Sequence, residues 1–100
     1  MSKFNENEKR TILQILIMIM EADEIIHPKE VEYIKTIMKD FGLSSAEFDH
    51  MDMLDFSVLK KEFGMMENDK RIIAKEYFMN LAKIDGNVHK NEQFLLDKLQ

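Results

Sequence analysis

The sequence predicts an all-α fold: a compact, single-domain helical bundle of about five to six helices over residues 1–100. Three observations lead to this class. The chain of 100 residues is long enough for one hydrophobic core and one domain. Its three glycines and single proline leave little of the turn punctuation that strand-rich folds need. Its apolar residues recur at helical spacing in several long runs.

An acidic segment occurs twice with identical spacing. Residues 23–30 read DEIIHPKE and residues 85–92 read DGNVHKNE, so Asp, His and Glu recur at the same offsets. Each copy follows one apolar helical run and precedes another. This predicts two pseudo-symmetric helix-loop-helix units over about residues 12–41 and 72–100. Residues 44–66 have no counterpart in the repeat and are predicted to form linker helices.

The first unit should contain two helices. The first is expected over about residues 5–21, with Asn5 as a cap, acidic residues in the first turn and enough apolar positions for a nearly enclosed helix. Pro28 suits the first turn of the second helix, and Gly42 suits its end. The core-facing side of this second helix is expected to carry Val31, Ile34, Ile37, Met38 and Phe41.

The linker should form two short helices. Ser44 and Glu47 match a capping box at the start of the first. Ser57 can cap the second, which would end near Gly64.

Two further helices complete the expected fold. A long helix should begin at Asn68 or Asp69 and run to the second acidic segment. A last helix is expected from Lys90 to the end of the sequence, burying Leu95, Leu96 and Leu99.

Composition argues against several classes of protein. Because the chain has no cysteine, it forms no disulfide and no Cys-ligated metal centre, and a cytoplasmic protein is expected. The N-terminus lacks the basic start and apolar stretch of a signal peptide. The longest apolar run, residues 12–20, is interrupted by Gln14 and is shorter than the roughly 20 residues that span a membrane, so no membrane insertion is expected. A net charge of −5 disfavours nucleic-acid binding.

The acidic segments partly match the calcium loop of an EF-hand. With Glu92 at position 12 of that loop, Gly86 falls at position 6, but the first and third positions become Leu81 and Lys83, which supply no carboxylate. One segment alone would bind calcium or magnesium weakly. If the fold brings the two segments together, four carboxylates form a candidate site for a divalent cation: Asp23, Glu30, Asp85 and Glu92.

Three more residues are secondary candidate ligands. Glu24 would add a carboxylate close to the site, and His27 and His89 could ligate zinc, since imidazole is a common zinc donor. Zinc ranks below calcium and magnesium here because spacing alone does not establish a zinc geometry.

The acidic residues also have a purely structural interpretation. Asp23 and Asp85 lie where a helix ends, where Asp often forms an Asx-turn. Glu30 and Glu92 lie in the first turn of the next helix, where a carboxylate is favoured by the helix dipole and can accept from the cap residue. Helix capping therefore stays open beside metal binding.

The same residues resemble those of a known family. An apolar helix, then Ala-x-Ala-Asp-Gly-x-[Ile/Val]-x-x-x-Glu, then a second apolar helix, twice in an all-helical domain, is the pattern of the tellurite-resistance TerB family. The amino-terminal domain of DjlA-type co-chaperones is similar. Residues 20–30 and 82–92 carry the match here, with Glu24 in place of Gly and Ile84 in place of a small residue.

The resemblance implies facing acidic loops that bind divalent metal, in a family connected with stress response and protein association. We therefore expect a non-enzymatic binding module with a protein partner. The alternatives are a structural interaction domain whose acidic segments only cap helices, and a metal-dependent enzyme. The enzyme is the least supported, because the sequence contains no catalytic triad pattern, Gly-rich phosphate loop or zinc-protease motif. The sequence does not separate a monomer from a homodimer.

Overall fold

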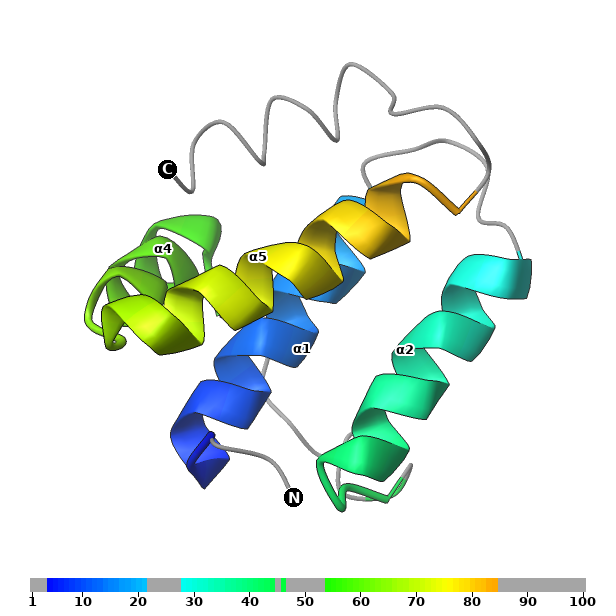
Figure 1. Cartoon of the computed structure of the whole chain (residues 1–100), viewed down its shortest axis with the longest axis horizontal. Helices are drawn as coiled ribbons and strands as arrows, with labels where there is room; N and C mark the ends of the chain where they lie inside the picture. The colour runs from blue at the N-terminus through cyan, green and yellow to red at the C-terminus, as the bar shows by residue number, and fades with distance from the viewer. Residues whose placement is uncertain (1–3, 22–27, 45, 47–53, 85–100) are drawn as a thin grey trace.

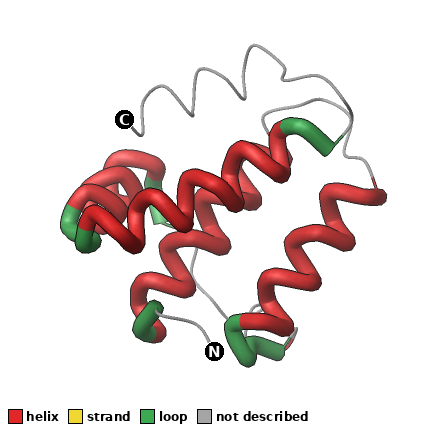
Figure 2. Tube along the Cα trace, in the orientation of Figure 1, coloured by secondary structure: helices red, strands yellow, loops and turns green. Residues whose placement is uncertain are grey.

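A computed structural model of the chain describes residues 4–21, 28–44, 46 and 54–84. Within these residues there are four α-helices and no strand, which confirms the all-α class (Figures 1 and 2). They are α1 (Glu6–Glu21), α2 (Pro28–Asp40), α4 (Phe56–Gly64) and α5 (Asn68–Ala82). Of the helix expected from Ser44, only Ser44 and Ala46 are described, and the helix expected from Lys90 lies outside the described residues.

Helix α1 is the centre of the described fold. Every residue from Thr11 to Ile17 is buried, and so is Ile19. Such a helix has neighbours on several sides, and α1 packs against α2, α4 and α5 (Figure 1). The expectation of a nearly enclosed first helix is confirmed.

The start of α1 is fixed by a reciprocal capping box. The Glu8 backbone N–H donates to Asn5 Oδ1 at 2.8 Å, and the Asn5 backbone N–H donates to Glu8 Oε1 at 2.9 Å. Both bonds satisfy N–H groups that an uncapped helix start would leave without an intrahelical partner. Asn5 is therefore the cap, as its position predicts.

The end of α2 is a Schellman motif built on Gly42. The Leu43 N–H donates to the Met38 carbonyl at 2.9 Å, and the Gly42 N–H donates to the Lys39 carbonyl at 3.0 Å. Gly42 has φ +74°, a conformation that side-chain-bearing residues rarely adopt. The prediction that Gly42 ends this helix is confirmed.

Helix α4 begins earlier than its sequence predicts. Its cap residue is Asp55, whose carbonyl accepts the N–H groups of Val58 and Leu59, and Ser57 already lies inside the first turn. The Asp55 side chain makes no capping hydrogen bond. A tertiary contact lies at this point instead, because the Leu54 N–H donates to Oε1 of the fully buried Gln14 in α1 at 2.9 Å. The prediction of Ser57 as the cap was wrong, since Asp55 takes that position.

Aromatic rings connect the helices around α1. Phe63 of α4 and Phe78 of α5 have ring centroids 5.6 Å apart. Phe41, just after α2, meets Phe4 at 5.7 Å and Tyr77 of α5 at 6.1 Å, both edge to face. These contacts hold the C-terminal end of α2 against the N-terminus and α5.

Candidate metal site

Glu30 is the one predicted metal ligand that lies within the described residues. The other six residues of the predicted set lie outside the described part of the chain: Asp23, Glu24, His27, Asp85, His89 and Glu92. That the carboxylates of the two segments meet in one site therefore stays a prediction. Among the residues that are described, no three His, Asp or Glu side chains gather into a group that could hold a metal ion.

Glu30 takes a core-facing position at the start of α2. It is the third residue of the helix, and only 2% of its surface is exposed. The buried residues Ile34, Ile37 and Met38 continue the same helical face. Val31, expected on that face, is only half-buried. A carboxylate thus occupies the place where the hydrophobic stripe of α2 would otherwise begin, which is rare because burying a charge is costly without compensating partners.

Two contacts establish which helix ends lie together. Lys70, near the start of α5, forms an ion pair with Glu8, near the start of α1, at 2.9 Å. The Nζ of Lys9 donates to the carbonyl of Phe41, just after α2, at 3.0 Å. The opposite ends of these helices therefore share the other side of the molecule: the end of α1, the start of α2 and the end of α5 (Figure 1).

Both acidic segments are attached to that shared side. The first follows Glu21 of α1 and leads into α2, and the second follows Ile84, just after α5. Glu30 lies at the same side because it is in the first turn of α2. The helices therefore bring the attachment points of the two segments together.

Two half-buried tyrosines, Tyr33 of α2 and Tyr77 of α5, lie near polar or charged groups of the other helix. Burial raises the pKa of the Tyr33 hydroxyl, and the neighbouring Tyr77 raises it further, whereas the polar side chain of Asn80 lowers it in part. Burial also raises the pKa of Tyr77, together with the negative charges of Asp40 and Glu76. Both phenols are therefore neutral at physiological pH.

No motif in the sequence points to Tyr33 or Asn80. One signal was available, because Tyr33 lies three residues after Glu30 and so shares its side of the helix. Nothing in the sequence places Asn80 near Tyr33, since that proximity depends on how α2 lies relative to α5.

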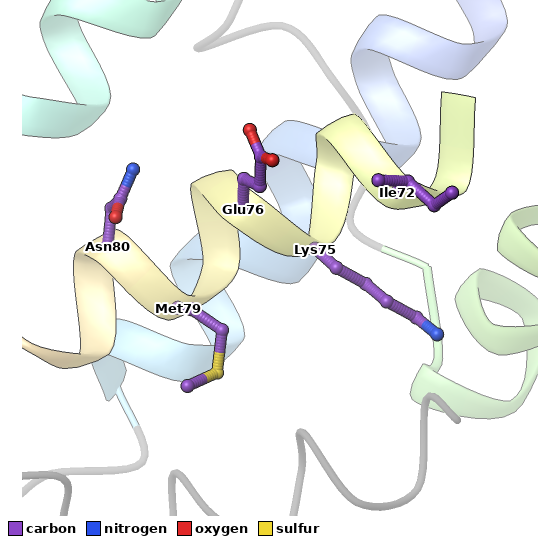
Figure 3. A pocket seen from close by; sticks show the side chains of 5 residues that line it. All are labelled: Ile72, Lys75, Glu76, Met79 and Asn80. Carbon is purple, nitrogen blue, oxygen red and sulfur yellow. The ribbon is translucent and has the colours of Figure 1, made fainter. Parts of the chain in front are cut away.

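The outer surface of α5 carries a shallow depression of about 360 Å³ (Figure 3). Five residues of this helix line it: Ile72, Lys75, Glu76, Met79 and Asn80. Asn80 and Glu76 project from one side of α5, whereas Lys75 and Met79 project from the other (Figure 3). The lining of the depression includes one carboxylate and one ammonium group, which is not the donor set of a cation site.

No helix among the described residues is both long enough and apolar enough to cross a lipid bilayer.

Comparison with known proteins supplies the family. The sequence model of the family described as "Tellurite resistance protein TerB" matches residues 1–53, which is more than half of the 100 residues. The match includes the first acidic segment and Glu30, and it ends before the second segment. Neither a curated protein nor a solved structure matches the chain. On the strength of the family match, this all-α protein belongs to the TerB family.

Proposed function

We propose that this chain is a non-enzymatic binding module in which the two acidic segments together hold one divalent cation. The proposed ligands are Asp23, Glu30, Asp85 and Glu92, with Glu24, His27 and His89 as secondary candidates. The cation, or the acidic surface around it, would organise association with another protein. The observation that carries this proposal is the buried carboxylate of Glu30 at the side of the molecule where both acidic segments begin.

The chemistry of the donors favours a hard cation. Calcium and magnesium prefer oxygen ligands, and the four main candidates offer only carboxylate oxygens. Zinc would need at least one histidine close to the carboxylates. We therefore propose calcium or magnesium ahead of zinc.

The absence of cysteine also bears on the role in tellurite resistance that the family description names. Tellurite is an oxidant, and the protein groups best suited to reduce it are thiolates, which this chain does not contain. Cation-dependent association, rather than chemistry on tellurite, is therefore the proposed role of this chain.

Helix capping is the second candidate explanation, and one observation favours it. Glu30 is the third residue of α2, and Glu8, which caps the start of α1 with Asn5, is the third residue of its own helix. A carboxylate at this position is a common capping device. The capping explanation predicts that stability does not depend on cations.

Thermal unfolding of metal-stripped protein separates the two explanations. A cation at about 100 times its dissociation constant should add roughly 2.7 kcal/mol to the free energy of unfolding, a rise in midpoint on the order of 10–20 °C for a domain this size. Calcium, magnesium, manganese and zinc would each be titrated into the wild type and into an Asp23→Asn, Asp85→Asn double variant.

The proposal expects calcium or magnesium to raise the midpoint of the wild type but not that of the double variant. An Asp40→Asn, Asp69→Asn variant is the matched control, because it removes the same charge from exposed helix positions. It should respond to the cation as the wild type does. If no cation shifts the wild-type midpoint, the proposed function is wrong and capping is the better explanation.

A further inference from the structure

Helix α5 carries apolar side chains on two opposite faces. Ile72 and Met79, two helical turns apart, both line the depression on its outer face, and Ile72 is 51% exposed. The inner face packs on the core around α1 and is almost fully buried: Ala74, Phe78, Leu81 and Ala82. A helix at the surface of a globular domain usually carries polar residues on its outer face, so apolar residues on both faces indicate a neighbour on each side.

The repeat indicates which part of the chain supplies the outer neighbour. The two acidic segments begin at residues 23 and 85, an offset of 62 residues. At this offset α5 starts at the equivalent of the first residue of α1, and residues 90–100 correspond to residues 28–38, which lie in α2. Because α2 packs against α1, residues 90–100 are expected against α5.

The apolar positions of residues 90–100 match the face of α2 that is buried. Ile34 and Ile37 of α2 are 6% and 2% exposed. Their equivalents at the repeat offset are Leu96 and Leu99. The side of residues 90–100 that corresponds to the buried side of α2 is therefore apolar as well, and it needs a surface to cover it.

We propose that the outer face of α5 is the docking surface for residues 90–100, with Leu96 and Leu99 packed over the depression beside Met79. As a helix this segment would be about 16 Å long, enough to follow most of α5. Residues 85–89 form a connection of the length that joins antiparallel helix pairs, so the docked helix runs back along α5. The proposal goes beyond the proposed function and requires no bound cation.

The depression suits a helix with an apolar stripe. Ile72 and Met79 supply apolar surface, and a methionine side chain adapts readily to the shape of its neighbour. Lys75 and Glu76 project from opposite sides of α5 (Figure 3), so their charged ends can stay in water on either side of a docked helix.

Thiol labelling of single-cysteine variants tests the docking, because the chain has no cysteine of its own. Leu96→Cys places the thiol on the side expected to be covered. Lys98→Cys places it on the opposite side, since Lys98 corresponds to the exposed Thr36 of α2. In metal-stripped protein with a chelator, the Leu96→Cys thiol should react about tenfold more slowly than the Lys98→Cys thiol, because it reacts only when the docked segment opens.

Met79→Glu identifies the surface that covers Leu96. A docked helix would bury the new charge, which is costly, so the variant should raise the labelling rate of Leu96→Cys to nearly that of Lys98→Cys. Met65→Glu is the matched control, because Met65 is 73% exposed at the end of α4 and does not line the depression. It should leave the labelling rate of Leu96→Cys unchanged.

Three results overturn the proposal. One is an equal labelling rate of Leu96→Cys and Lys98→Cys, and another is a Leu96→Cys rate that Met79→Glu leaves unchanged. The third is a Leu96→Cys rate that falls as the protein concentration rises, which assigns the surface to a second copy of the chain. The proposed function is tested separately by cation titration, so its failure and the failure of the docking are read from different measurements.

A second measurement decides the question if Met79→Glu does not fold. A short bis-maleimide should cross-link Met79→Cys to Leu96→Cys within one chain. Met65→Cys combined with Leu96→Cys is the control and should not cross-link. Absence of the intramolecular cross-link between positions 79 and 96 overturns the proposal.

Discussion

Two glutamates, Glu8 and Glu30, occupy equivalent helix positions in this molecule, and Glu8 is the more exposed of the two. Glu8 and Glu30 are the third residues of α1 and α2. Glu8 accepts the Asn5 N–H and faces the ammonium of Lys70 at 2.9 Å. Burial alone would raise the pKa of Glu8, but the backbone bond from Asn5 and the charge of Lys70 outweigh it, so the pKa is lowered overall. Glu8 therefore contributes to stability as a carboxylate.

Glu8→Gln should destabilise the protein in a pH-dependent way. Glutamine keeps an acceptor for the Asn5 N–H but removes the charge that faces Lys70. We therefore expect the free energy of unfolding at pH 7 to fall by about 1 kcal/mol. A lowered pKa stabilises the fold above the unfolded-state value of about 4.3, and this stabilisation disappears as pH falls through the lower folded-state value. Urea unfolding from pH 7 to pH 3 measures the free energy of unfolding of wild type and of Glu8→Gln. The difference between these two free energies should become smaller below about pH 4.3.

The exposed Glu6 provides the control for that experiment. It pairs with Lys9 at 3.5 Å, but 79% of its side chain is exposed. Exposed ion pairs of this kind contribute little, so Glu6→Gln should leave stability nearly unchanged at every pH. A constant difference between wild type and Glu8→Gln down to pH 3 would contradict the role assigned to the Glu8 charge.

The helices differ in whether their ends are specified locally or by tertiary contacts. Asn5 starts α1 and Gly42 ends α2 through bonds to near neighbours in the sequence, and both boundaries are predicted correctly. The start of α4 lies beside a contact between Leu54 and Gln14, forty residues apart. No local pattern could reveal that contact, and the sequence predicts Ser57 as the cap.

Gly42→Ala should destabilise the protein through the backbone alone. A Cβ at this position meets no atom within 4 Å, so the cost comes from the positive φ of 74° and should be about 1 kcal/mol. Gly64→Ala is a matched control, because its Cβ also meets nothing within 4 Å and it lies at the end of α4 without a positive φ. Chemical denaturation should show Gly64→Ala to be neutral or stabilising. Equal losses in the two variants would contradict this explanation.

Gln14→Met should reduce the free energy of unfolding by more than Asp55→Ala, which removes the side chain of the α4 cap residue. Methionine fills a similar volume but accepts hydrogen bonds poorly, so the Leu54 N–H would lose its partner at a cost of about 1–3 kcal/mol. Asp55→Ala should cost less than the ~1 kcal/mol typical of a cap residue, because its side chain makes no capping bond. Urea unfolding of the two variants measures both values. The reverse order of losses would show that Asp55, not Gln14, fixes the start of α4.

At the scale of the whole molecule, the arrangement of helices connects the fold to the proposed site. The all-α class and the four described helices are predictable because their apolar spacing and most of their caps are local features. Glu30 is recognisable as a candidate ligand from the repeat, but its burial is not, since the apolar stripe of α2 could equally have begun at Val31. The proximity of Tyr33 to Asn80 depends on how two helices lie relative to one another and has no signature in either segment.

The central claim is that the carboxylate of Glu30 binds a cation rather than only serving the helix start. Glu30→Gln keeps the shape and an acceptor oxygen, so capping would be largely preserved, whereas cation binding would lose a charged ligand. The measurement is the free energy of unfolding of wild type and Glu30→Gln, each with and without saturating calcium or magnesium. We predict that the difference in free energy of unfolding between wild type and the variant is larger when the cation is present, because the bound cation adds an interaction with the Glu30 charge. A difference between the two proteins that is the same with and without cation would contradict it.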